Sequence, residues 1–210
     1  AEDPQLFQPK ETQAALQDFS KAFAQVGHSG TPNEFDGKPV EGVLTHGGRY
    51  LWVSYYRRSY DRNGVLPSAM AVIDTKTDTI VRVMPTGPIP KFLATSPDGK
   101  WLAVVHWGDN SVGLVDIRGE DPAAFNMVGD IVVERRLRLE LDPEGKIDRD
   151  RLCGFCLRGA VFTKDSQTLL VGRMGGGGIA VLDIAARHHI GSVWGMRPTP
   201  RHLEISPDGQ

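Results

Sequence analysis

Cys153 and Cys156, separated by Gly-Phe, are the only two cysteines of the chain. Two thiols at this spacing can form a local disulfide, act as a redox-active pair, or supply half of a tetrahedral zinc site. The next residue is Leu157 rather than histidine, which excludes covalent haem attachment here, and no second CxxC exists to complete a zinc site. The motif also lacks the helix start that activates a redox thiol. In an exported protein we therefore predict a Cys153–Cys156 disulfide, with a redox-active pair as the alternative.

A second set of residues has the chemistry to bind an anion. Its members are Tyr55, Lys91, His106, Arg158, Arg173, Arg201 and His202. Lysine and arginine hold carboxylates and phosphates through charge-assisted hydrogen bonds, and a local excess of cations is informative in a chain of net charge −2. The sequence has no Ser-His-Asp order, no paired carboxylates in a defined pocket and no metal-ligand cluster. We expect no catalytic residue, no metal site and no cofactor.

These residues belong to a chain that repeats two sequence elements. The strand segment AVIDTKTDTIVRV recurs as GLVDIRGEDPAAF and AVLDIAARHHIGSV, with aspartates 42 and then 67 residues apart. The turn SPDGK recurs, with one degenerate copy, at 45–49, 96–100, 163–167 and 206–210. Spacings of 51, 67 and 43 residues between these turns give a unit of 42–43 residues, with insertions of nine and 25 residues between strands.

A repeat of this length with four short strands is typical of a propeller blade. One blade cannot bury both of its faces, so blades stack around an axis. The SPDG turn should join the first two strands, because proline presets φ and glycine supplies a positive φ. The third strands should centre on Ile73, Val115 and Leu182. We predict an all-β fold of four-stranded antiparallel blades over residues 40–210, with a β-sandwich as the alternative.

Residues 87–117, GPIPKFLATSPDGKWLAVVHWGDNSVGLVDI, resemble the YVTN repeat of surface and exported β-propellers. The resemblance covers residues 40–210, with one departure at His106-Trp107, where the family usually has a small residue or asparagine. It implies a propeller of seven blades, completed by the rest of a longer protein or by another chain. The blades implied within this chain span 40–87, 88–152 and 153–196, with the start of the next at 197–210.

The same resemblance implies a non-enzymatic binding or scaffold module that takes a protein partner or an anionic ligand. Lactonases, amine dehydrogenase heavy subunits and haem-d1 proteins also resemble this repeat class, so a hydrolytic or cofactor-dependent enzyme is the alternative. Related propellers hold cofactors with histidines at channel rims. His106 is therefore either such a ligand or, beside Trp107, a packed and hydrogen-bonded histidine.

Aligning the repeats on the SPDG turn places the candidate residues at equivalent positions. Five residues before the turn, at the start of the innermost strand, lie Val40, Lys91, Arg158 and Arg201. Ten residues after its first residue, at the end of the second strand, lie Tyr55, His106 and Arg173. Because these two strands are antiparallel, both sets should meet at one rim of the central channel. We predict an anion site there; the alternative is that acidic residues of further blades, or channel water, neutralise these cations.

The N-terminal region differs from the repeats. Apolar residues at helical spacing predict a helix over residues 10–26, within an arm that spans 1–39. The chain opens with Ala-Glu-Asp-Pro rather than methionine, which is typical of a protein whose signal peptide has been removed. We therefore expect a periplasmic or extracellular location. No apolar run is long enough for a membrane-spanning helix, and the net charge of −2 disfavours nucleic acid as a partner.

Overall fold

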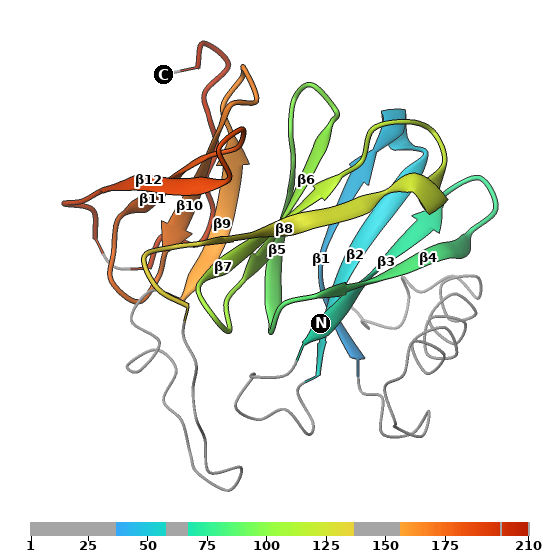
Figure 1. Cartoon of the computed structure of the whole chain (residues 1–210), viewed down its shortest axis with the longest axis horizontal. Coiled ribbons are helices and arrows are strands. Elements are labelled where there is room, and N and C mark those ends of the chain that lie inside the picture. Colours follow the sequence, from blue (N-terminus) through green and yellow to red (C-terminus); the bar gives the residue numbers. More distant parts are fainter. Residues whose placement is uncertain (1–36, 58–66, 137–155, 198, 210) are drawn as a thin grey trace, which may run out of the picture.

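The computed structural model describes residues 37–57, 67–136, 156–197 and 199–209, and these form three separate four-stranded sheets (Figure 1). The first sheet contains β1 (Gly37–Thr45), β2 (Tyr50–Arg57), β3 (Ser68–Asp74) and β4 (Thr79–Thr86). The second contains β5 (Pro90–Thr95), β6 (Trp101–His106), β7 (Ser111–Asp116) and β8 (Asn126–Val132). The third contains β9 (Leu157–Phe162), β10 (Thr168–Arg173), β11 (Ile179–Asp183) and β12 (His188–Val193). Two 3₁₀ turns, η2 (His46–Gly48) and η3 (Pro122–Ala124), complete the elements described.

Within each sheet the strand order follows the chain, and all neighbouring strands are antiparallel. The innermost strands β1, β5 and β9 lie next to one another, so the sheets spread as a fan (Figure 1). Ile73, Val115 and Leu182 lie in the third strands β3, β7 and β11. The predicted all-β architecture of four-stranded antiparallel sheets is confirmed. The total of seven blades stays a prediction, and the predicted helix at 10–26 lies outside the described residues.

The SPDG turn joins the first and second strands by a side-chain network. In the second sheet Ser96 Oγ donates to Asp98 Oδ1 (2.6 Å), the amide of Lys100 donates to the same oxygen (3.1 Å), and Gly99 has a φ of +70°. In the third sheet Thr163 and Asp165 form the equivalent side-chain bond (2.6 Å). The repeated sequence therefore reproduces one turn geometry, which sets where each second strand begins.

The first two sheets pack on each other through large apolar side chains. Trp52, Phe125 and Leu102 are buried in one cluster, and the rings of Trp52 and Phe125 are 5.3 Å apart. Trp52 also donates its indole N–H to Thr45 Oγ1 at 2.9 Å. Because Trp52 belongs to the first sheet and Phe125 to a loop of the second, this cluster fixes the position of one sheet on the next.

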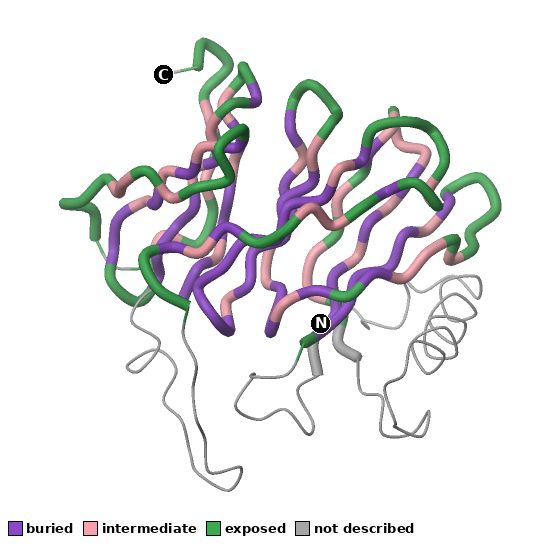
Figure 2. Tube along the Cα trace, in the orientation of Figure 1, coloured by how far each residue is buried: buried purple, intermediate pink, exposed green. Residues whose placement is uncertain are grey.

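The second sheet is covered on both faces, whereas the third is not. All residues of β7 up to Val115 are buried, because neighbouring sheets cover both sides of the strand. One side meets the first sheet, and the other packs Leu114 against Leu157 and Leu169 of the third. Exposed residues gather instead along β12, at one side of the fan (Figure 2). No helix among the described residues is long and apolar enough to cross a bilayer.

Candidate functional site

The innermost strands of all three sheets are irregular at the same place. The ladder between first and second strands shifts register at Pro39/Glu41 in the first sheet, between Pro90 and Phe92 in the second, and opposite Val171/Arg173 in the third. The residues at these shifts are Val40 in the first sheet, Lys91 in the second, and Arg158 and Gly159 in the third. Bulges of this kind re-aim side chains and interrupt pairing. Lys91 and Arg158, which are both half-buried, therefore lie at equivalent bulges of adjacent inner strands.

The segment after the third sheet brings Arg201 to this end. A Cβ on Gly159 would lie 2.6 Å from the Arg201 carbonyl oxygen, and one on Gly172 would lie 2.8 Å from that of Pro200. Glycine at both positions thus lets this segment pack directly on β9 and β10. Arg201 is exposed, and among the described residues no acidic side chain forms an ion pair with Arg201 or Arg158.

His202 follows on the same segment and is exposed. Its Nε2 lies 3.2 Å from Glu204 Oε1, and its ring centroid lies 5.6 Å from that of Phe92 in β5. The contact links the segment after the third sheet to the inner strand of the second. Arg158, Arg201 and His202 are therefore neighbours around β9, with Lys91 on the adjoining strand.

The three second-strand residues of the predicted set lie at the same end but in the interior. Tyr55, His106 and Arg173 pair with Pro39, Pro90 and Leu157 of the first strands. All three are buried. Burial raises the pKa of Tyr55 to about 12. Their position along the strand matches the repeat alignment, and their side chains are buried within the described residues.

His106 is held by a chain of hydrogen bonds. The amide N–H of Gly87 donates to His106 Nε2 (3.0 Å), so Nδ1 carries the proton and donates to Ser111 Oγ (2.8 Å). Ser111 then donates to Asp109 Oδ1 (2.7 Å), and Arg136 bridges Asp109 to Asp130 at 2.6 and 2.7 Å. The structure places His106 as a packed, hydrogen-bonded histidine with both ring nitrogens occupied.

The trio of His106, Ser111 and Asp109 has the residue types of a hydrolytic triad in the wrong arrangement. In a triad the histidine accepts the serine proton and donates to the carboxylate. Here the serine lies between the other two, donates to Asp109 and accepts from His106. All three side chains are buried. This trio therefore does not activate a nucleophile.

Burial lowers the pKa of His106. The negative charges of Asp109 and Asp130 oppose this decrease, and the positive charge of Arg136 adds to it. The unfolded chain binds a proton at this residue near pH 6.5 while the folded chain does not, so stability is present above that pH and falls as the pH drops below it. We expect the free energy of unfolding to decrease between pH 7.5 and 5.5, with a slope approaching about 1.4 kcal/mol per pH unit. Urea denaturation at several pH values measures this dependence.

Two variants distinguish the contribution of His106 to this pH dependence from the contributions of other titratable groups. His106→Gln should be less stable at pH 7.5 but should lose the slope, whereas His188→Gln, at an exposed histidine, should keep it. The carboxylates whose pKa is lowered by hydrogen bonds, such as Asp98 and Asp165, titrate below this pH range. An unchanged slope in His106→Gln would contradict the assignment.

Arg173 is the most deeply placed cation of the predicted set. Its side chain is 0% exposed, and its guanidinium lies 2.8 Å from Glu134 Oε1, 2.6 Å from Ser192 Oγ and 4.1 Å from the centre of the Trp194 ring. A buried charge needs such a partner. The repeat alignment could not identify Glu134 or Trp194, because both lie outside the repeated strand segments.

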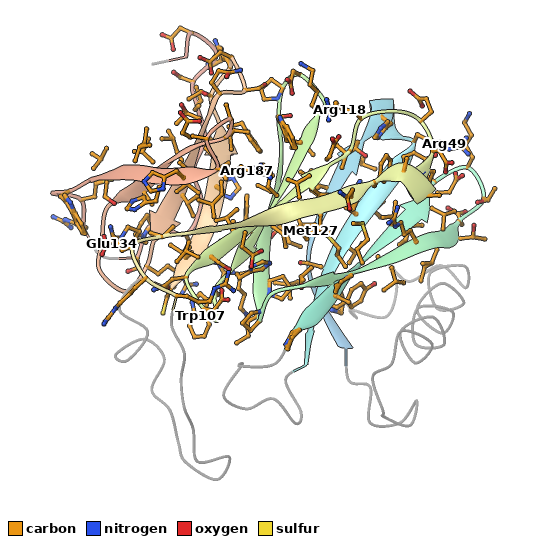
Figure 3. The ribbon with its side chains drawn as sticks, in the orientation of Figure 1. Arg49, Trp107, Arg118, Met127, Glu134 and Arg187 are labelled. Carbon is orange, nitrogen blue, oxygen red and sulfur yellow. The ribbon has the colours of Figure 1, made fainter. Side chains whose placement is uncertain are left out.

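The two ends of the sheets carry different groups. Figure 3 shows Trp107 and Glu134 at the end where the second strands finish, and Arg49 and Arg118 at the opposite end, near the turns between first and second strands. Cys156 is buried near Trp107 and Met174. Its predicted partner Cys153 lies outside the described residues, so the disulfide stays a prediction.

The chain resembles solved structures in its fold. No protein-family model and no curated protein sequence matches the chain. Solved structures do match. Hydrazine synthase of Kuenenia stuttgartiensis aligns with a TM-score of 0.60 and 22% identity, over 86% of this chain and 43% of that one. The β-propeller domain of Myceliophteria thermophila Cps50 (Swd1) aligns with a TM-score of 0.51 and 12% identity, over 96% of this chain and 49% of that one.

A protein from Lactobacillus plantarum also aligns, with a TM-score of 0.58 and 16% identity, over 87% of this chain and 49% of that one. The chain has a β-propeller fold. Its three sheets are blades, and the end that carries Lys91, Arg158 and Arg201 is one rim of the propeller. The chain spans just under half the length of these three structures. At these identities the likeness concerns the fold, and function has to be argued from the site.

Proposed function

We propose that this chain is part of a non-enzymatic, exported β-propeller of the YVTN-repeat type that binds an anionic ligand or the acidic segment of a protein partner at one rim. The observation that carries the proposal is that Lys91 and Arg158 lie on adjacent inner strands, with Arg201 on the segment that packs against β9. We define these three residues as the cationic rim. His202 adds a hydrogen-bonding group beside it.

Electrostatics favours an anion at the cationic rim. Like charges on neighbouring strands repel, and a bound carboxylate or phosphate offsets that repulsion through charge-assisted hydrogen bonds. Arg158 and Arg201 form no ion pair with any acidic residue of the described chain, in contrast to Arg173, which contacts Glu134. The proposal therefore rests on Arg158 and Arg201, while Tyr55, His106 and Arg173 support the rim from inside the blades.

Further blades belong to the same proposal. The third blade and the residues just after it carry four exposed large apolar residues. They are Ile190, Val193, Trp194 and Met196, with Trp194 at 57% exposed. Their area favours cover by another blade, from the rest of a longer protein or from another chain.

A periplasmic or extracellular location accounts for the cysteine pair in this proposal. In an oxidising compartment Cys153 and Cys156 would form a disulfide directly before β9, the strand that carries Arg158. The link would restrain the residues that lead into the cationic rim.

Binding of a fluorescent peptide rich in aspartate and glutamate tests the proposal. We expect saturable binding that weakens as sodium chloride is raised, because partly exposed charges are screened by salt. Arg158→Ala combined with Arg201→Ala should reduce the affinity at least about tenfold, since each lost contact contributes roughly 1 kcal/mol at such a site. Fluorescence anisotropy measures both effects.

The matched control is Lys100→Ala combined with Arg118→Ala. It removes two cations at the opposite end of the second blade, where they pair with Asp98 and Asp116. This control should bind the peptide as the unsubstituted protein does. Equal losses in both double variants would mean that net charge, not the cationic rim, attracts the peptide. A visible absorption band in the purified protein would favour the enzyme alternative instead.

A further inference from the structure

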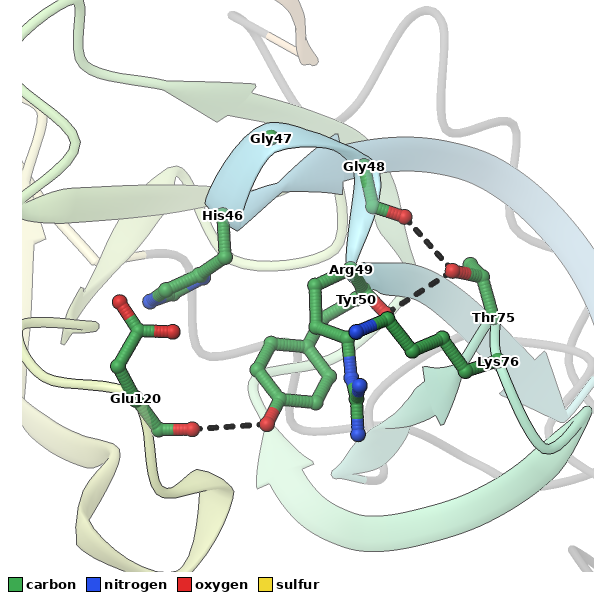
Figure 4. Close-up of a pocket in the computed structure, with 8 residues that line it drawn as sticks. All are labelled: His46, Gly47, Gly48, Arg49, Tyr50, Thr75, Lys76 and Glu120. Carbon is green, nitrogen blue, oxygen red and sulfur yellow. Dashed lines mark hydrogen bonds between the residues drawn. The ribbon is translucent and has the colours of Figure 1, made fainter.

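A pocket of about 650 Å³ opens at the end of the propeller opposite the cationic rim. It is lined by His46, Gly47, Gly48, Arg49, Tyr50, Thr75, Lys76 and Glu120 (Figure 4). These residues come from two turns of the first blade and from one loop of the second. We propose that this pocket binds a small zwitterion, with one carboxylate and one protonated amine, such as a free amino acid or a short peptide.

Hydrogen bonds between the two blades make the wall of the pocket rigid. Gly119 and Ile117 offer their carbonyl oxygens to His46 Nε2 at 2.8 and 3.1 Å. The Tyr50 hydroxyl donates to the carbonyl oxygen of Glu120 at 2.7 Å. The His46 ring also stacks on Phe125, with centroids 5.2 Å apart. The pocket is therefore formed in advance by contacts that hold the blades together.

Most polar groups of the lining already have protein partners. Arg49 forms an ion pair with Asp74. The Thr75 hydroxyl donates to the Gly48 carbonyl oxygen at 2.8 Å. The Tyr50 hydroxyl and the His46 Nε2 proton serve the contacts between the blades. These groups shape the pocket, and Asp74 offsets the positive charge of Arg49.

Two charges of the lining remain without an ion pair in the described part of the chain. They are the ammonium of Lys76 and the carboxylate of Glu120, both on exposed residues. Figure 4 shows Glu120 beside His46 on one side of the pocket and Lys76 with Thr75 on the other, with Tyr50 and Arg49 between them. The pocket thus presents one positive and one negative group across an aromatic and polar floor.

This arrangement selects against singly charged ligands. A simple anion gains the attraction of Lys76 but is repelled by Glu120, and a simple cation meets the reverse. A zwitterion whose carboxylate faces Lys76 and whose ammonium faces Glu120 is attracted by both. The volume lies within the range of about 300–1,000 Å³ that small-molecule sites occupy. A free amino acid or a short peptide fits this volume.

Glycylglycine and its two capped forms test the proposal by isothermal titration calorimetry. N-acetylation removes the positive end and C-terminal amidation removes the negative end. We expect each cap to weaken binding to the unsubstituted protein about fivefold, the effect of losing one solvent-exposed ion pair. Glu120→Gln should weaken the binding of uncapped glycylglycine by a similar factor, and N-acetylation should not weaken its binding further. In Lys76→Met, C-terminal amidation of the dipeptide should leave the affinity unchanged.

Lys100→Met is the control, because it removes an exposed lysine that lies outside the pocket. It should bind all three peptides as the unsubstituted protein does. Binding that depends on Lys76 but not on Glu120 would show a plain carboxylate site and overturn the proposal. Equal affinity for the parent and both capped forms, or no binding of the dipeptide, would overturn it as well. The cationic rim lies at the other end of the blades, so its double alanine variant should leave this binding unchanged.

Discussion

Replacing Trp52 with alanine is expected to lower the free energy of unfolding by about 3–5 kcal/mol, a large share of the stability of a typical domain. The Trp52 side chain is fully buried between the first and second blades. The substitution opens a cavity beside Phe125, and Thr45 Oγ1 loses the indole N–H that donates to it. Chemical denaturation followed by circular dichroism measures the loss.

Leu44→Ala is the matched control for that experiment. Leu44 lies in β1, one position before Thr45, and is 54% exposed. Its replacement should change the free energy of unfolding by no more than about 0.5 kcal/mol. Equal stability of the two variants would mean that the first blade does not pack on the second through Trp52, and would contradict the packing described above.

The fold could be predicted because one local signal recurs. Asp98 and Asp165 close the same turn in two blades, and glycine or another residue with positive φ follows each of them. Each copy of the turn sets the register of the first two strands of its blade. Aligning the copies of the turn in the sequence therefore places equivalent residues of the blades in correspondence. The third strands then followed from their apolar alternation.

The depth of the site residues could not be predicted in the same way. Repeat alignment gives a position along a strand, but burial depends on what packs against the side chain from elsewhere. His106 is enclosed because Gly87 and Ser111 occupy both ring nitrogens. Arg173 is enclosed because Glu134 and Trp194, from segments without a repeat, cover it. Lys91 and Arg158 are only half-buried and lie where their strands bulge. No residue type in the sequence predicts these bulges.

The pocket at the opposite end was missed for a related reason. Its charged residues, Lys76 and Glu120, lie in turns of two different blades and are 44 positions apart in the sequence. They come together only because Tyr50 and His46 hold the second blade against the first. A site of this kind depends on the packing between repeats, which an alignment of positions within the repeats does not reveal.

Reversing the charges of the cationic rim should reverse its choice of ligand. In Arg158→Glu combined with Arg201→Glu, two attractive contacts to an acidic peptide become repulsive, and like-charge contacts of this kind suppress binding strongly. The same two carboxylates should attract a lysine-rich peptide. Both side chains are exposed or half-buried, so the fold should tolerate the change. Circular dichroism spectra of the variant should match those of the unsubstituted protein.

Anisotropy titrations of the acidic and the lysine-rich peptide against this variant test whether the cationic rim is an anion site. The control is Lys100→Glu combined with Arg118→Glu, which changes the net charge equally at the opposite end. We expect the cationic-rim variant to lose binding to the acidic peptide and to bind the lysine-rich one, while the control keeps the original preference. The same change of preference in both variants, or in neither, would contradict an anion site formed by Lys91, Arg158 and Arg201.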